Sequence, residues 1–218
     1  MRLRHVKGIE EKIESFSDII ITEPEKYKGN WNEYFKNNNP IYMEIGSGKG
    51  KFIIEHALKN PDINYIACEI NSSVIYKAAK SLKNKNYNLP NLVFLNYDAF
   101  NLNNAISNHE ITKIFLNFSD PWPKNRHEKR RLTSDNCIEI YRNILIPHGE
   151  IEFKTDNRLL FEYSIMKFNE QHLEMEKLSL DLHNTDKKSK YEEITITTEY
   201  EEKFMGLNQL IYYVKVRI

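Results

Sequence analysis

Short apolar segments alternate with longer amphipathic segments through the middle of the chain. The apolar segments predict five strands, at 41–45, 63–69, 92–97, 112–118 and 149–154. The segments with helical spacing of apolar positions predict four helices, at 51–59, 71–84, 133–145 and 157–170. Such alternation is typical of an α/β fold, in which helices cover both faces of a mostly parallel sheet. The carboxyl ends of the strands then form the binding edge.

Both ends of the chain depart from this alternation. Residues 1–40 are polar and rich in asparagine, and they predict a basic N-terminal arm and a lead-in helix before a single domain at 41–218. Near the C-terminus, 173–182 and 209–218 have the pattern of β segments, with no convincing long helix between them. We therefore expect an antiparallel pair that closes the sheet. The polar segment at 184–190 is expected to be a connection, and the role of its lysine-rich part, Lys187–Lys190, is open.

Composition and charge narrow the class of protein. A chain of 218 residues with 40% hydrophobic content can bury one sizeable core. Lysine plus arginine equals aspartate plus glutamate at 31 each, so binding to nucleic acid must come from a local patch. Cys68 and Cys137 form no C-x-x-C motif and are expected to be buried and reduced, and the scattered histidines suggest no metal site. No apolar run reaches the length of a membrane span, so the prediction is a cytoplasmic protein.

A glycine-rich turn follows the first predicted strand. Gly46, Gly48 and Gly50 stand at alternate positions between this strand and the helix at 51–59. Missing side chains let a ligand approach the backbone closely, which makes a strand, glycine turn and helix typical of a nucleotide site. The spacing differs from the G-x-G-x-x-G dinucleotide pattern and from the P-loop.

Carboxylates end the successive predicted strands. Glu44 lies two residues before Gly46, where it would repel a pyrophosphate but attract the ammonium and sulfonium of S-adenosylmethionine. Glu69 stands where an acidic side chain commonly accepts hydrogen bonds from ribose hydroxyls. Asp98 is placed to receive the adenine amino group. Each acid alone is more often a solvated strand end or a helix cap, but four strands that end in acids, with Asp120 as the fourth, favour a cofactor site.

Asp120 lies on a proline-stiffened turn that leads into a basic segment. Pro121 and Pro123 restrict the backbone on both sides of Trp122, so the Asp120 carboxylate is expected to have a defined direction. Five of the eight residues at 124–131 are lysine or arginine. The segment is either a solvated helix start or a phosphate-binding surface beside the reaction centre.

Four motifs together resemble the bacterial tRNA (guanine-N7-)-methyltransferase family. They are the segments at 44–50, 117–132, 153–157 and 198–204, and the similarity runs from Met1 to the final strand. The resemblance implies a Rossmann-like class I methyltransferase fold with an antiparallel C-terminal strand. It also implies S-adenosylmethionine as methyl donor and the variable-loop guanine of tRNA, at position 46, as acceptor.

The resemblance also implies roles for individual residues. Asp120 is the expected catalytic residue. The expected cofactor-binding residues are Glu44, Gly46, Gly48, Gly50, Glu69, Asp98 and Asp120. The expected substrate-binding residues are Lys124, Asp156, Thr198 and Glu201, and the expected RNA-contacting residues are Arg126, His127, Lys129, Arg130 and Arg131. Asp156 and Glu201 are both chemically suited to read the guanine N1–H and amino group, and the sequence does not choose between them.

Other functions stay open at this point. A nicotinamide-dependent oxidoreductase has the same fold class, but the glycine spacing and Glu44 count against it. A non-catalytic RNA-binding module accounts for the basic segment but has no need of four aligned acids. A methyltransferase that acts on another RNA guanine is a further alternative. No metal and no obligate protein partner are expected, and a monomer or a weak homodimer is the predicted state.

Overall fold

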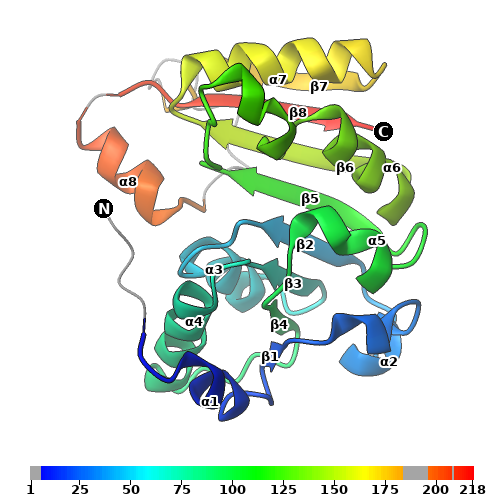
Figure 1. Ribbon diagram of the computed structural model, residues 1–218, viewed down its shortest axis with the longest axis vertical. Coiled ribbons are helices and arrows are strands. Elements are labelled where there is room, and N and C mark those ends of the chain that lie inside the picture. The colour runs from blue at the N-terminus through cyan, green and yellow to red at the C-terminus, as the bar shows by residue number, and fades with distance from the viewer. Residues whose placement is uncertain (1–5, 184–195, 208) are drawn as a thin grey trace.

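The computed structural model describes residues 6–183, 196–207 and 209–218 (Figure 1). Within them, eight strands form one sheet. Their bounds are β1 Ile20–Ile21, β2 Ile41–Ile45, β3 Asn64–Cys68, β4 Leu92–Leu95, β5 Ile111–Asn117, β6 Leu145–Thr155, β7 Glu174–Ser179 and β8 Tyr212–Arg217. The strand order is β1-β4-β3-β2-β5-β6-β8-β7.

Most strand pairs of this sheet are parallel. The pairs β1 with β4, β4 with β3, β3 with β2, β2 with β5 and β5 with β6 are parallel. By contrast, β8 runs antiparallel to both β6 and β7, between which it lies. The structure confirms the expected mostly parallel sheet with an antiparallel C-terminal closure.

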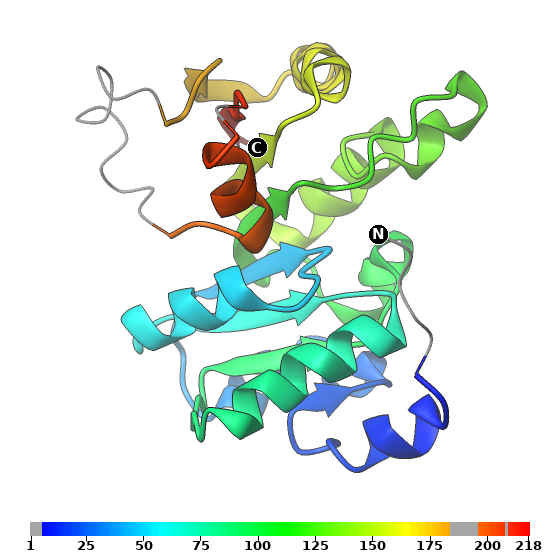
Figure 2. The same cartoon turned by 90° about the vertical axis from the view of Figure 1, so that its left-hand side faces the viewer.

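Helices cover both faces of the sheet. Their bounds are α1 Ile9–Glu14, α2 Trp31–Phe35, α3 Lys51–Lys59, α4 Ser72–Asn84, α5 Leu102–Ala105, α6 Asp135–Ile144, α7 Arg158–Glu170 and α8 Glu199–Met205. Short 3-10 helices lie at η1 Pro24–Tyr27, η2 Ala99–Asn101 and η3 Asn125–Arg130. Helices α1, α3 and α4 pack on one face, whereas α2, α5, α6 and α7 pack on the other (Figures 1 and 2).

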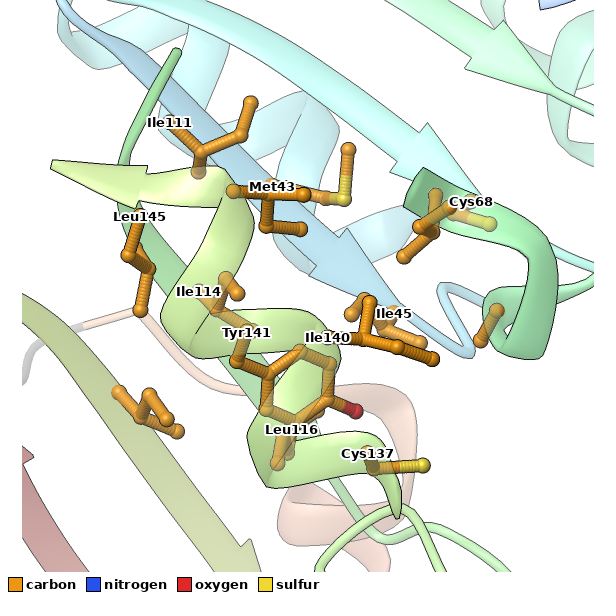
Figure 3. Close-up of a cluster of buried hydrophobic side chains, with 14 of the residues drawn as sticks. Met43, Ile45, Cys68, Ile111, Ile114, Leu116, Cys137, Ile140, Tyr141 and Leu145 are labelled. Carbon is orange, nitrogen blue, oxygen red and sulfur yellow. The ribbon is translucent and has the colours of Figure 1, made fainter. Parts of the chain in front are cut away.

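The larger core lies between the sheet and α6. Met43 and Ile45 of β2 and Leu116 of β5 meet Cys137 and Tyr141 of α6 in one buried cluster (Figure 3). In β3, Cys68 also belongs to this cluster, whereas the alternate residues Tyr65 and Ala67 enter the second core on the opposite face. Strands buried on both faces account for the nearly continuous apolar runs in the sequence. Cys68 and Cys137 are both buried free cysteines, as expected.

The five predicted strands and four predicted helices are present within a few residues of their expected bounds. The largest shift is at β6, which begins at Leu145 directly after α6. The elements that were not predicted include β1, which pairs with β4, the short helix α5, and α8, which lies before β8. Where one lead-in helix was expected before residue 41, the structure has α1 and α2. The expected connection at 184–190, with Lys187–Lys190, lies outside the described residues.

Candidate active site

The glycine-rich loop joins β2 to α3 at the carboxyl edge of the sheet, the edge turned to the viewer in Figure 2. Gly46 and Gly48 have φ values of 76° and 57°, conformations that strain any residue with a side chain. The Gly46 amide donates a hydrogen bond to the Cys68 carbonyl oxygen at 2.9 Å, which ties the loop to β3. A Cβ atom added to Gly48 would meet no atom of the described residues within 4 Å. The loop therefore has an open side at Gly48 where a ligand can approach the backbone.

Gly50 has a different surrounding from the other two glycines. A Cβ atom added there would lie 3.2 Å from the Ala78 Cβ atom and 3.1 Å from the Phe94 ring. Its φ of 77° would also strain a side chain. The packing of α3 against α4 and β4 thus requires glycine at this position, and a direct contact of Gly50 with a cofactor stays a prediction.

Glu44 is buried at the end of β2, with 2% of its surface exposed. The Asn117 amide of neighbouring β5 donates a hydrogen bond to Glu44 Oε1 at 2.9 Å. Burial raises the pKa of Glu44 to about 8, although the Asn117 amide and the positive charge of Lys154 act in the opposite direction. A cation placed beside this carboxyl group would lower its pKa and form a strong ion pair.

Glu69 and Asp98 follow β3 and β4 at the same edge. Glu69 Oε2 accepts a hydrogen bond from the Gly48 amide at 3.1 Å, and Glu69 Oε1 accepts one from the Asn71 amide at 2.8 Å. Asp98 Oδ1 accepts a hydrogen bond from the Phe100 amide at 3.0 Å and caps η2. The two carboxylates thus shape their loops, and each oxygen keeps lone-pair capacity for a further donor.

Three buried polar atoms at this edge have no hydrogen-bond partner among the described residues. They are Glu44 Oε2, Ser47 Oγ and Ser119 Oγ. They belong to β2, to the glycine-rich loop and to the segment after β5, which are adjacent in space because β2 pairs with β5. Buried polar groups are rarely left unpaired, and such atoms point to a missing ligand. The chain's own groups therefore fit S-adenosylmethionine, which carries an ammonium, a sulfonium and ribose hydroxyls.

Asp120 lies after β5, on the same edge, and its side chain is exposed. The turn around it is strained, because Phe118 and Trp122 have φ values of 50° and 42°. Pro121 and Pro123 fix the backbone on both sides of Trp122. A rigid presentation of Asp120 stays a prediction.

The basic segment forms η3 and the residues next to it, which stand apart from α6. Lys124, Arg126, Lys129 and Arg130 have exposed side chains. Arg130 lies over the Trp122 ring, 5.0 Å from its centroid, and His127 meets the same ring edge-on at 5.6 Å. The fifth basic residue, Arg131, points back to the turn. It donates hydrogen bonds to the carbonyl oxygens of Pro121 and Trp122.

Asp156 and Glu201 differ strongly in their surroundings. Asp156 follows β6 and is half-buried, and the side chain of exposed Gln209 lies 3.4 Å from its Oδ2 atom. Glu201 of α8 is fully buried at 0% exposure. Its carboxylate lies 3.2 Å from Lys154 Nζ and 2.7 Å from His183 Nε2. Although burial raises the pKa of Glu201, the His183 hydrogen bond and the Lys154 charge hold it below its usual range.

Thr198 begins α8 as its N-cap. Its hydroxyl oxygen accepts a hydrogen bond from the Glu201 amide at 3.0 Å, and the Glu201 carboxylate accepts one from the Thr198 amide at 3.2 Å. This reciprocal pair is a capping box and stabilises the short helix. Two of the expected substrate-binding residues thus have a structural role within α8.

Sequence reasoning did not single out several residues that shape the site. Lys154 is buried at 1% exposure and pairs with Glu201, although it lies only two residues before Asp156. Tyr200 is 58% exposed and stacks on Phe118 with a centroid distance of 6.2 Å, and Phe204 lies beside both rings. The motif at 198–204 contains both α8 aromatics, but their meeting with Phe118 depends on tertiary structure.

The described residues contain no group of three or more histidine, cysteine or acidic side chains that could hold a metal ion. Across the same part of the chain, no helix is long and apolar enough to cross a membrane.

Comparison with known proteins gives concordant results. Residues 38–214 match the family model described as "Putative methyltransferase". The chain is 49% identical over 216 residues to the tRNA (guanine-N(7)-)-methyltransferase of Bacillus velezensis, with 99% of this chain and 96% of the relative covered. It is 48% identical to the protein of the same description from Streptococcus uberis, with 99% of each chain covered.

Solved structures show similarity of fold. The 16S rRNA methyltransferase KamB superposes with a TM-score of 0.63 at 14% sequence identity, over 87% of this chain and 93% of that protein. At this level of identity the likeness concerns the fold alone, and it is a class I methyltransferase fold.

Proposed function

The chain belongs to the tRNA (guanine-N(7)-)-methyltransferase family, and from this premise we propose how its residues carry out the reaction. The reaction is transfer of a methyl group from S-adenosylmethionine to N7 of the variable-loop guanine of tRNA. The observation that carries this proposal is the 49% identity, which extends over 99% of the chain.

We divide the site into a cofactor side and an RNA side. The cofactor side consists of Glu44, the glycine-rich loop, Glu69 and Asp98. The RNA side consists of Asp120, the basic segment at 124–131, Asp156 and α8. When bound, S-adenosylmethionine supplies an activated methyl group on a sulfonium.

On the cofactor side, the buried Glu44 carboxyl group faces the cationic part of the cofactor. Its Oε2 atom has no partner among the described residues, which supports this placement. Glu69 holds the Gly48 amide in position and accepts hydrogen bonds from ribose hydroxyls. Asp98 accepts a hydrogen bond from the adenine amino group. Ile70, which directly follows Glu69 and is 65% exposed, offers an apolar surface for the adenine ring.

On the RNA side, no general base is needed for the chemical step. Guanine N7 carries an in-plane lone pair, so attack on the methyl group requires no proton removal. Catalysis then depends on holding donor and acceptor in line, an effect that lowers barriers by about 7–11 kcal/mol in favourable intramolecular models. Asp120 orients the guanine and offsets the positive charge that passes to the base as the methyl group moves.

The surroundings of the two candidate carboxylates favour Asp156 as the reader of the guanine edge. Glu201 is buried, and its oxygens already accept from Lys154, His183 and the Thr198 amide. Asp156 is half-buried, and its long contact with Gln209 leaves acceptor capacity free. Glu201 accordingly fixes α8, and α8 in turn presents Tyr200 as a flat surface beside the base.

The exposed cations of the basic segment bind tRNA phosphates. Lys124, Arg126, Lys129 and Arg130 all lie on the surface near Asp120 in the chain. The protein as a whole has no net charge, so this local patch provides the attraction. We also assign the protein to the cytoplasm, where tRNA is present, and to action without an obligate protein partner.

The test is a methyl-transfer assay on unmodified tRNA, with the product mapped by mass spectrometry. We expect 7-methylguanosine at the variable loop with the wild-type protein. Asp120→Asn keeps the side-chain shape but removes the charge, and we expect a loss of about 10²- to 10³-fold in turnover. Methylation at another atom, or wild-type turnover in this variant, would contradict the proposal.

A further inference from the structure

The turn that carries Asp120 stores backbone strain on both sides of that residue. Phe118 and Trp122 have positive φ values of 50° and 42°, which side-chain-bearing residues rarely adopt. Such conformations persist only where surrounding contacts hold them. Some group must therefore hold this turn in place.

Arg131 makes contacts that hold the part of the turn after Asp120. Its Nε atom donates to the Pro121 carbonyl oxygen at 3.2 Å, and its Nη2 atom donates to the Trp122 carbonyl oxygen at 3.1 Å. The planar guanidinium thus donates hydrogen bonds to two successive carbonyl groups, directly after Asp120. Its face lies over the Tyr163 ring of α7, 4.2 Å from the centroid. The planar fork and the stacking are both properties of arginine that lysine lacks.

The segment that carries Arg131 is itself fixed to the core. The Tyr141 hydroxyl of α6 donates to the Leu132 carbonyl oxygen at 3.0 Å. The Thr133 and Ser164 hydroxyl groups lie 2.7 Å apart in a buried hydrogen bond that joins the segment to α7. The position of the turn is therefore set by α6 and α7 through Arg131.

The neighbouring cations have a different arrangement. Arg126 and Lys129 are exposed, and Arg130 is exposed above the Trp122 ring. Arg131 is half-buried, and two of its nitrogen atoms already donate to backbone oxygens. Its geometry fits a role within the protein better than a role in binding phosphate.

We infer that Arg131 is a positioning residue that keeps Asp120 aligned with the reacting groups by holding the strained turn. This inference rests on the proposed role of Asp120. It separates Arg131 from the exposed cations of the basic segment, with which the family resemblance groups it. The consequence is that Arg131 acts on turnover, whereas Lys129 acts on tRNA binding.

The experiment compares Arg131→Lys with Lys129→Ala in the full-length protein. Arg131→Lys keeps the positive charge but loses the fork, so we expect turnover at saturating tRNA to fall about 10- to 100-fold. Its tRNA affinity, measured over a range of salt concentrations, should keep the wild-type slope. Lys129→Ala should keep its turnover at saturating tRNA but bind tRNA more weakly. Its slope of log affinity against log salt concentration should be smaller by about one unit.

Tryptophan fluorescence gives a readout that does not depend on activity. The chain has two tryptophans, and Trp31 is fully buried, so acrylamide quenching reports mainly on Trp122. We expect stronger quenching in Arg131→Lys at an unchanged melting temperature, because the turn loosens while the core is intact. Wild-type turnover and quenching in Arg131→Lys would overturn the inference. Failure of the wild-type protein to methylate guanine N7 would instead count against the proposed function. The quenching measurement would still test whether Arg131 holds the turn.

Discussion

The cofactor side and the RNA side of the site are built in different ways. The cofactor side lies at the ends of the parallel strands β2, β3 and β4, where Glu44, Glu69 and Asp98 bond to neighbouring backbone or side-chain groups. Apart from Asp156, the RNA side lies on a strained turn, a 3-10 helix and the seven-residue helix α8. The sheet therefore preforms one side, whereas side-chain contacts such as Lys154 with Glu201 and Arg131 with the turn assemble the other. This contrast predicts that each side can be disabled separately.

The largest expected effect concerns the ion pair that holds α8. Lys154→Met removes the lysine charge beside buried Glu201, and we expect the free energy of unfolding to fall by about 3–5 kcal/mol. Urea unfolding measures this change. The double variant Lys154→Met with Glu201→Gln removes both charges and should be more stable than the single variant.

A lysine on the surface of α8 provides the matched control. Lys203 is exposed, and Lys203→Met should change the free energy of unfolding by no more than about 0.5 kcal/mol. Equal losses in Lys154→Met and Lys203→Met would mean that the buried pair does not hold the RNA side together.

The next largest effect concerns the cofactor side alone. Glu69→Ala removes a charged hydrogen-bond acceptor, which costs about 1.5–3 kcal/mol, or roughly 10- to 150-fold in affinity for S-adenosylmethionine. Calorimetry measures that affinity, and tRNA binding should be nearly unchanged. Glu139, an exposed residue of α6, is the control position, and Glu139→Ala should change neither the affinity for S-adenosylmethionine nor the affinity for tRNA. A parallel loss of tRNA affinity in Glu69→Ala would break the separation between the two sides.

A smaller effect follows from the raised pKa of Glu44, which is about 8 in the free protein. Below this pH the group is mostly protonated, so binding a cationic cofactor must release a proton. Affinity for S-adenosylmethionine should therefore rise with pH between 6 and 8, by at most about tenfold per pH unit, and level off above 8. The folding stability of the cofactor-free protein should instead fall as pH rises. The contribution of Glu44 to that stability is fully present below its unfolded pKa and is lost as pH rises through about 8.

Calorimetry at several pH values, with Glu44→Gln as the control, measures this dependence. The variant lacks the titrating group and should show the shallower profile that comes from the ligand alone. Identical profiles in the two proteins would exclude Glu44 as the partner of the cofactor cation.

The cofactor side was also the more predictable from sequence, for a physical reason. Glu44 and Glu69 end apolar strands, and parallel strands bring their carboxyl ends to one edge, so strand patterns alone place these acids together. The strand β1 was missed because two residues, Ile20 and Ile21, are too few to show a pattern. Its pairing with β4 depends on tertiary structure.

The RNA side depends on contacts that leave little trace in the sequence. Lys154 alternates with Phe153 in β6 and so points away from the larger core, as expected for an exposed lysine. It is buried because α8 and Phe52 cover it. The basic segment suggested one surface of five like charges, yet Arg131 turns inward to backbone carbonyls. Composition indicates the charge of a segment but not the direction of each side chain.

The most direct test of the central claim is a tRNA that carries 7-deazaguanine at the variable-loop target. Replacing N7 by C–H removes the attacking lone pair but keeps the base shape, the Watson-Crick edge and the phosphate backbone. We expect this tRNA to bind with nearly wild-type affinity and to accept no methyl group when the product is examined by mass spectrometry. Methyl incorporation into the deaza base at the normal rate would show that the acceptor atom is not N7 and would contradict the proposed chemistry.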